Sequence, residues 1–314
     1  MTVEPGRPGV RGGPPQSLHT GIATLVGRPN VGKSTLLNQL VGTKVSIVSD
    51  RPQTTRNQVR GVWNGPGSQI VFIDTPGIHK PKTELGRRLN QRSIETLTAV
   101  DVICFLIDAR AEIGAGDRYI AGLLAEVGTP VVLVVNKIDD AGPAEVLGHL
   151  AGAADALGDF AAYVPLSAWT GEGTEALLGE ITARLPEGPL YYPDGVVTDQ
   201  PDTFLAAELL REKLLAMARE ELPHSLAVTV EEIEERPGDG DREPLLVLRA
   251  VVRVERDSQK GIVIGKGGAV IKAAGTAARL ELEALLGTKV HLETHVKVEK
   301  DWQRRPDALD RLGF

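Results

Sequence analysis

The 314-residue sequence has one cysteine, few aromatic residues and no long apolar run. Cys104 has no second cysteine to pair with, which excludes an internal disulfide and fits a reducing, cytoplasmic environment. No apolar stretch approaches the roughly 18 residues that a membrane-spanning helix requires. The first 18 residues are rich in Pro, Gly and Arg and lack the apolar core of a secretory signal, so we expect a disordered extension at 1–18.

The chain also lacks an excess of basic residues, because its net charge is −7. Any nucleic-acid site must therefore be a local patch. Aromatic residues make up only 4% of the sequence, so a surface on which bases stack along several rings is not expected.

Short apolar runs alternate with helical patterns from residue 19 to residue 185. The apolar runs predict strands at 23–26, 70–73, 102–107, 131–135 and 163–166. The helical patterns lie near 33–40, 85–99, 116–127, 143–157 and 174–185. Strands that are apolar throughout and alternate with helices indicate an α/β fold with a doubly wound, mostly parallel sheet covered on both faces.

A second, α+β domain is predicted at 202–300, after a Pro- and Gly-rich linker at 186–201. Its pattern predicts a helix at 202–222, alternating strands at 226–235 and 245–255 around a turn at 237–241, an apolar turn at 262–264, a helix at 269–286 and a strand at 290–298. A tail at 301–314 follows.

A glycine-rich loop stands between the first strand and the first helix. Glycines let successive main-chain N–H groups face a phosphate, and the helix N-terminus adds its positive dipole. In such a P-loop, Lys33 reaches the β- and γ-phosphates and Ser34 is a ligand of Mg²⁺. The residues predicted to cradle the nucleotide are Gly27, Arg28, Pro29, Asn30, Val31, Gly32, Lys33, Ser34 and Thr35.

Three further motifs follow strands of the same predicted sheet. After the strand at 70–73 come Asp74, Thr75, Pro76 and Gly77. Asp74 at a strand end can hold Mg²⁺ through water, and the Gly77 N–H can meet a γ-phosphate, although an ordinary turn is the alternative.

Guanine selection is predicted at the ends of the next two strands. Asn136, Lys137 and Asp139 follow one strand, and Ser167 and Ala168 follow the other. The Asp139 carboxylate can accept hydrogen bonds from N1–H and the N2 amine of guanine, which adenine does not offer. The Ala168 N–H can donate to guanine O6. Four motifs at strand carboxyl ends define one pocket at the edge of the sheet.

These motifs make residues 20–185 resemble the G domain of translation-factor-type GTPases, and the runs GRPNVGKSTLLN, DTPG and NKID resemble the Era subfamily. The resemblance implies GTP or GDP with Mg²⁺ as cofactors, and hydrolysis of GTP. It makes Ser49 to Arg56 switch I, where Thr54 or Thr55 supplies a further Mg²⁺ ligand; we favour Thr55. Switch II is expected from Asp74 to about Lys82.

Ile78 stands where small signalling GTPases carry a water-orienting Gln, so slow intrinsic hydrolysis is expected. The resemblance implies that a potassium ion held partly by Asn30 can supply the missing positive charge. Lys33, Asn30, Thr55 and Gly77 are therefore the predicted catalytic residues.

The second domain carries the loop Gly265, Lys266, Gly267 and Gly268. A GxxG loop allows close approach of an RNA backbone, and apolar neighbours can receive unstacked bases. The order of elements around it is that of a type II KH domain, and residues 257–265 resemble the Era version.

Residues 256–305 carry ten Lys or Arg against six Asp or Glu. The predicted RNA contacts are Lys260, Ile262, Ile264, Gly265, Lys266, Gly267, Gly268 and Lys272. Arg279 is a further candidate, and the acidic Glu281 and Glu283 are expected to face solvent.

The resemblance covers residues 20–312. It implies a monomeric GTPase switch that binds the 3′ end of 16S rRNA and assists maturation of the 30S subunit precursor in the cytoplasm, with peripheral association at the inner face of the membrane. One alternative is an RNA-binding assembly chaperone whose nucleotide is structural and turns over negligibly. A GTPase that assists RNA modification is another, although no cofactor-binding module supports it.

Overall fold

The computed structural model describes residues 18–51, 54–79, 81, 83–217, 225–238 and 243–314. The extension expected before residue 18 therefore lies almost wholly outside the described residues, as do Pro52, Gln53, Lys80 and Lys82 of the two expected switches. The end of the helix predicted at 202–222 and residues 239–241 of the expected turn also lie outside them.

The first domain is a six-stranded sheet in the order β2-β3-β1-β4-β5-β6, in which only the β2–β3 pair is antiparallel. This confirms the predicted P-loop α/β fold. The strands are β1 (His19–Gly27), β2 (Val59–Gly65), β3 (Ser68–Asp74), β4 (Val102–Asp108), β5 (Val131–Asn136) and β6 (Ala162–Leu166). Strand β2 was not predicted from the sequence, because its apolar residues are interrupted by Arg60, Gly61 and Asn64.

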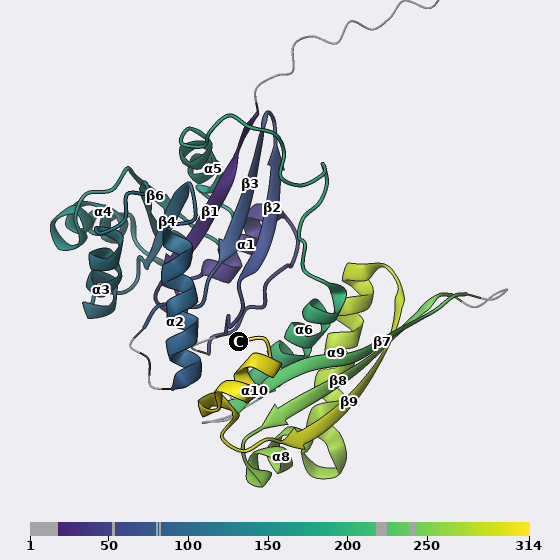
Figure 1. Ribbon diagram of the computed structural model, residues 1–314. Coiled ribbons are helices and arrows are strands. Elements are labelled where there is room, and N and C mark those ends of the chain that lie inside the picture. The colour runs from purple at the N-terminus through teal and green to yellow at the C-terminus, as the bar shows by residue number, and fades with distance from the viewer. Residues whose placement is uncertain (1–17, 52–53, 80, 82, 218–224, 239–242) are drawn as a thin grey trace, which may run out of the picture.

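Five helices cover the two faces of this sheet (Figure 1). They are α1 (Lys33–Val41), α2 (Glu84–Leu97), α3 (Ala115–Leu124), α4 (Pro143–Leu157) and α5 (Thr174–Thr182). Apolar side chains of α1 and α5 pack against one face, and those of α2, α3 and α4 pack against the other. Central strand β4 is buried on both sides, which explains its uninterrupted apolar run.

The second domain is a three-stranded sheet in the order β7-β8-β9, with β7–β8 antiparallel and β8–β9 parallel. Its elements are α6 (Asp202–Met217), β7 (Ala227–Arg236), β8 (Leu245–Val254), α8 (Asp257–Ile264), α9 (Ala269–Leu286) and β9 (Lys289–Val298), followed by α10 (Pro306–Arg311). Alternate residues of β8, from Leu246 to Val254, join α6 and α9 in one core, as their period of two predicts.

One local prediction in this domain was wrong. Residues 262–264 were expected to form an apolar turn, but they are the last residues of helix α8. Only Val263 of the three is buried, while Ile262 is exposed. A helix of eight residues shows barely two turns of periodicity, which is too little to distinguish it from a turn by pattern alone.

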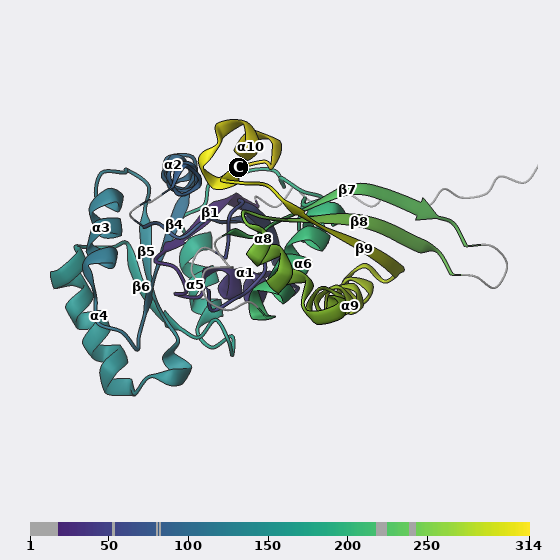
Figure 2. The same ribbon diagram turned by 90° about the horizontal axis from the view of Figure 1, so that it is seen from below.

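The two domains contact each other through the loop after α1 and through α2. Figure 1 and Figure 2 both place α10 beside α2. Ile47, from the loop after α1, is buried in the core of the second domain. Leu85 and Leu89 of α2 share a cluster with Trp302 and Leu309 of the tail. Arg88 of α2 also forms an ion pair with Asp310, at 2.5 Å. The second domain therefore contacts the segments that flank the predicted nucleotide site.

Candidate functional site

The loop between β1 and α1 lies at the carboxyl edge of the sheet and needs glycine at defined positions. Gly32 has a φ of +100°, and a Cβ there would overlap the Asn136 side chain. A Cβ on Gly77 would lie 2.9 Å from the main-chain nitrogen of Pro29. The loop is therefore packed directly against the motifs that follow β5 and β3, which leaves its main chain close to any bound phosphate.

Lys33 begins α1 and is 6% exposed. Its Nζ donates to the carbonyl oxygens of Gly27, at 3.2 Å, and Arg28, at 2.9 Å. Burial lowers the pKa of Lys33 to about 8, and the nearby charge of Asp74 opposes this shift. The ammonium group is thus held inside the loop, at the position from which a P-loop lysine reaches phosphate oxygens.

Three oxygen-bearing side chains meet beside Lys33. Ser34 Oγ donates to Asp74 Oδ2 at 2.6 Å and lies 2.9 Å from Thr55 Oγ1. Asp74 is fully buried, and its Oδ1 has no hydrogen-bond partner among the described residues. Burial raises the pKa of Asp74, while Lys33 and the neighbouring hydroxyl groups oppose the shift.

A buried carboxylate oxygen without a partner, beside two hydroxyl groups, is a set of hard oxygen donors of the kind that Mg²⁺ prefers. The residues present therefore fit a magnesium ion. Thr54 points elsewhere, because its hydroxyl donates to the carbonyl of Arg51 at 2.6 Å. Between the two threonines left open by the sequence, the geometry favours Thr55. Ser46, which also donates to Asp74 Oδ2 at 3.1 Å, was not predicted.

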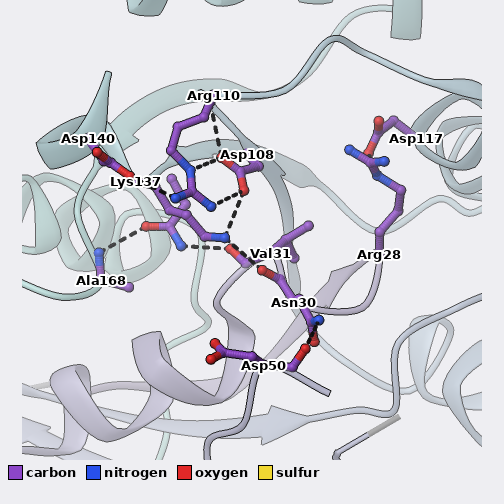
Figure 3. A network of polar contacts seen from close by, with 11 residues as sticks. Arg28, Asn30, Val31, Asp50, Asp108, Arg110, Asp117, Lys137, Asp140 and Ala168 are labelled. Carbon is purple, nitrogen blue, oxygen red and sulfur yellow. Dashed lines mark hydrogen bonds and ion pairs between the residues drawn. The ribbon is translucent and has the colours of Figure 1, made fainter. Parts of the chain in front are cut away.

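The neighbouring pocket of about 230 Å³ is lined by Asp139 and Ala168, together with Lys137 and Gly32. Asn136 is buried and donates from Nδ2 to the carbonyl of Val31 at 2.7 Å. Lys137 donates from Nζ to the carbonyl of Asn30 and to Asp108 Oδ2, both at 2.7 Å (Figure 3). These contacts connect the predicted base-selecting motif to the phosphate loop.

Figure 3 also shows a charged network at the rim that sequence reasoning missed. Arg110 joins Asp108, at 3.1 Å, to Asp140, at 2.7 Å. Burial of Asp108 raises its pKa, but hydrogen bonds from Arg110 and Lys137 outweigh this effect and lower the pKa to about 2. The carboxylate that holds Lys137 is therefore ionised at physiological pH. No spacing in the sequence marks Arg110, which contacts Asp140 across 30 positions.

The main-chain N–H predicted to meet guanine O6 has a partner within the protein. The Ala168 N–H donates to Asn136 Oδ1 at 2.9 Å. A hydrogen bond from this group to a purine would therefore require the N–H to be shared or the contact to Asn136 to lengthen. Ala168 itself still lines the pocket.

The structure brings most of the predicted nucleotide residues to the two adjoining pockets, but some point away. The Arg28 guanidinium leaves the loop to pair with Asp117 of α3 at 2.8 Å (Figure 3). Thr75 is buried and donates to the carbonyl of Leu25 at 3.0 Å. Gly27, Arg28, Val31, Asp74, Thr75, Pro76 and Ser167 do not line the described pockets.

Ile78 is 2% exposed and belongs to the apolar cluster on the α2–α3–α4 face. Its side chain is therefore part of the core, and it has no polar atom with which to orient water. Asn30, by contrast, is exposed, and its Nδ2 donates to the carbonyl of Asp50 at 2.6 Å. This contact joins the phosphate loop to the segment predicted to be switch I.

In the second domain, the predicted GxxG loop joins α8 to α9. Gly265, Gly267 and Gly268 all have positive φ, and a Cβ on Gly267 or Gly268 would meet no atom within 4 Å. The open side of the loop therefore leaves room for the backbone of an RNA to approach its main chain closely. Lys266 and Lys272 are exposed, Lys260 is half-buried, and none of the three forms an ion pair among the described residues.

The apolar residues around this loop divide into two groups. Ile262 is 52% exposed, whereas Ile264 and Ile271 pack against the domain core. Arg279 pairs with Glu283 at 2.8 Å. The expectation that Glu281 and Glu283 face solvent was wrong. Glu281 pairs with Lys44 of the first domain at 2.6 Å and also with Lys213. Glu283 pairs with Arg279, and its Oε1 accepts a hydrogen bond from the Val290 N–H at 3.0 Å.

Fold and site together define a P-loop GTPase joined to a KH domain, with the element order of type II. Models of two families agree: that described as 50S ribosome-binding GTPase matches residues 22–137, and that of the KH domain matches residues 221–303. Curated relatives cover nearly the whole chain. GTPase Era of Mycobacterium tuberculosis (strain H37Rv) is 51% identical over 300 residues, 95% of this chain and 99% of the relative. GTPase Era of Heliobacterium modesticaldum is 49% identical over 299 residues, which are 95% and 98% of the two chains.

The chain belongs to the Era family of GTPases, which confirms the resemblance inferred from its motifs. Two solved structures are similar over 94% of this chain and 99% of theirs, each with a TM-score of 0.89 and 42% identity. One is an Aquifex aeolicus Era variant bound to GDP and AlF4⁻. The other is Era in complex with MgGDPNP and nucleotides 1506–1542 of 16S ribosomal RNA.

Proposed function

We propose that the protein is a GTP-hydrolysing switch that binds the 3′ end of 16S rRNA through its KH domain and assists maturation of the 30S subunit precursor. The meeting of Ser34, Thr55 and Asp74 around a buried carboxylate oxygen carries the proposal. This arrangement supports the proposal because it joins a residue of the predicted switch I to the predicted Mg²⁺ ligands of the P-loop, which is the contact that a γ-phosphate switch requires. The relative that binds MgGDPNP together with 16S rRNA supports the same assignment.

In this proposal the residues of the chain divide the work of phosphoryl transfer. Lys33 and the N–H groups of the loop bind the β- and γ-phosphates, and the Gly77 N–H holds a γ-phosphate oxygen. Ser34, Asp74 and Thr55 hold Mg²⁺, which neutralises charge on the phosphates when bound. Asp139 selects guanine, and Lys137 fixes the base-selecting motif against the phosphate loop. Loss of the γ-phosphate therefore releases Thr55 and Gly77, because both lose a contact that exists only while that phosphate is bound.

Potassium activation is part of the proposal. Since Ile78 is buried and apolar, another group must supply positive charge at the γ-phosphate. The exposed Asn30 side chain supports this proposal, because its Nδ2 donates to the carbonyl of Asp50 and so brings one main-chain oxygen beside the phosphate loop. We expect faster turnover in KCl than in NaCl at equal ionic strength. Equal rates in the two salts would remove potassium from the mechanism.

A nucleotide with a structural role only is the competing function, and burial of Ile78 favours it because nothing in that position can orient water. Single-turnover hydrolysis distinguishes the two. Phosphate release that is abolished in Lys33→Ala supports the switch. Undetectable release in the wild-type protein, with GDP raising its melting temperature, supports the structural nucleotide.

We further propose that the protein is a monomer in the cytoplasm and that it associates peripherally with the inner face of the membrane. Within the described residues, every helix is too short or too polar to cross a bilayer. Crosslinking to total RNA with a GTP analogue and with GDP tests the ribosomal assignment. We expect the sequences of the crosslinked RNA to be enriched at the 3′ end of 16S rRNA. Sequences scattered over the total RNA would contradict the ribosomal assignment.

A further inference from the structure

Ser46 is a buried serine outside the motifs of the nucleotide site, and its hydroxyl donates to Asp74 Oδ2 at 3.1 Å. Two other hydroxyl groups donate to the same oxygen, from Ser34 at 2.6 Å and from Thr55 at 3.4 Å. These two residues are predicted Mg²⁺ ligands, whereas Ser46 lies outside that set. Its hydroxyl can therefore hold the carboxylate of Asp74 while the other two bind the metal.

The main chain of Ser46 is fixed to helix α1 by the side chain of Asn38. Asn38 Oδ1 accepts hydrogen bonds from the N–H groups of Val45 and Ser46, both at 2.9 Å. Asn38 Nδ2 donates to the Ser46 carbonyl at 2.8 Å. Since α1 begins at Lys33, one helix holds both the serine and the lysine of the phosphate loop.

The residues on either side of Ser46 are held by the second domain. Ile47 is 2% exposed and belongs to the core of that domain. Lys44 forms ion pairs with Glu212 of α6, at 2.7 Å, and with Glu281 of α9, at 2.6 Å. None of the three charged side chains is more than 28% exposed, so salt screens these pairs less than it screens fully exposed ones. This segment therefore joins the two domains, and Ser46 is its contact to the predicted Mg²⁺ site.

The orientation of Asp74 matters because its two oxygens have different surroundings. Oδ2 accepts the three hydroxyl groups, while Oδ1 is buried without a hydrogen-bond partner among the described residues. A carboxylate that rotated freely would lose the arrangement in which one oxygen is occupied and the other is available to a cation or its bound water. Groups that orient a metal ligand in this way typically contribute about 10- to 100-fold to metal affinity.

We infer that Ser46 is a positioning residue for the Mg²⁺ site and that the second domain sets its position through Lys44 and Ile47. The inference rests on the proposed function, because it assumes a magnesium ion beside Asp74. The Ser46 hydroxyl occupies one oxygen of that carboxylate and leaves the other to the metal. A displacement of the second domain moves the neighbours of Ser46 and so changes how tightly Mg²⁺ is held.

Release of a fluorescent, non-hydrolysable GTP analogue from the full chain, measured at buffered concentrations of Mg²⁺, tests the inference. Mg²⁺ that bridges the protein and the phosphates slows release, so the concentration that gives half of this slowing reports the affinity for the metal. Ser46→Ala should raise that concentration at least about tenfold. In excess EDTA its release rate should match the wild type, because Ser46 lines neither of the two pockets of the nucleotide site. The matched control is Ser68→Ala, at a buried serine at the opposite end of β3 from Asp74, and it should behave like the wild type.

Glu281→Gln tests the contribution of the second domain, because this carboxylate lies on α9 and contacts Lys44. Loss of its charge should raise the same Mg²⁺ concentration about two- to fivefold, as expected for a partly exposed ion pair. Glu293→Gln removes a charge from a pair with Arg249 on the sheet of that domain and should have no effect. If Glu281→Gln kept the wild-type value, the second domain would not set the position of Ser46.

Two results for Ser46→Ala would overturn the inference. One is a wild-type dependence of release on Mg²⁺, which would mean that the hydroxyl does not orient Asp74. The other is release that is accelerated equally with Mg²⁺ and with EDTA, which would mean that the substitution distorts the pocket. Release from the wild-type protein that did not depend on Mg²⁺ would instead overturn the magnesium site of the proposed function.

Discussion

The main-chain N–H of Val48 donates to Glu212 Oε1 at 2.9 Å, although 164 positions separate the two residues. Val48 precedes switch I, and Glu212 lies on α6, the first helix of the KH domain. The next residue of that helix towards its N-terminus, Arg211, donates to the carbonyl of Thr54. Adjacent residues of α6 thus contact both Val48 and Thr54 in the segment that leads to Thr55, so we expect a change in the predicted switch I to alter its contacts with the KH domain.

Removal of the Glu212 carboxylate should loosen switch I. In Glu212→Ala the Val48 N–H loses a charged acceptor, and such bonds contribute about 1.5–3 kcal/mol. We expect hydrogen exchange in the segment 46–51 to become at least about tenfold faster. The matched control is Glu180→Ala, which removes a carboxylate from a surface pair on α5. Unchanged protection of switch I in Glu212→Ala would show that the contact does not order it.

Lys33 should make stability depend on pH. Its pKa is lowered to about 8 by burial, whereas the unfolded chain keeps the ordinary value of 10.5. Between these values the unfolded state binds more protons than the folded state, so the free energy of unfolding rises with pH across this window.

The comparison with Lys33→Met isolates this contribution. The wild-type free energy of unfolding should rise relative to the variant from about pH 8 to 10.5, by at most about 3 kcal/mol, and the difference should be flat below this range. Urea denaturation of the nucleotide-free proteins measures it. Parallel profiles for the two proteins across this window would rule out a lysine whose pKa is lowered by burial.

Asp139 should determine the choice of base. In Asp139→Asn the side chain offers an amide donor where guanine also offers a donor, so GDP binding should fall by about 100-fold. Xanthosine diphosphate, which carries a carbonyl in place of the amine, should bind better than it does to the wild type. Asp140→Asn changes the adjacent exposed carboxylate that pairs with Arg110 and should leave the preference for GDP intact. If both variants kept that preference, the carboxylate of Asp139 would not read the base.

Lys266 should contribute a phosphate contact to RNA binding. Loss of one such contact lowers the slope of log affinity against log salt by about one. Lys266→Ala should show this change with an oligonucleotide that carries the 3′ end of 16S rRNA. Lys289→Ala removes an exposed lysine near Glu243 instead and should leave the slope unchanged. Equal slopes for wild type and Lys266→Ala would place the RNA backbone elsewhere.

Much of the fold and of the nucleotide site could be predicted because the evidence is local in sequence. Apolar runs such as 102–107 are buried on both faces, and each motif follows its strand within a few residues. Strand β2 and helix α8 escaped prediction because one is interrupted by polar residues and the other is too short to show a period.

The remaining contacts depend on residues that the chain brings together over long separations. Glu281 follows the pattern of a solvent-facing helix position, yet it pairs with Lys44 across 237 positions. Ser46 and Arg110 likewise lie outside any motif and join the site only through folding.

The affinity of the full-length protein for the 3′ end of 16S rRNA, measured with a bound GTP analogue and with bound GDP, tests the central claim most directly. Because α6 contacts Val48, just before the predicted switch I, and Thr54 within it, the two affinities should differ by about tenfold, which is within the usual range of coupling between sites. Equal affinities in the two nucleotide states would mean that the domains act independently, and would contradict the account.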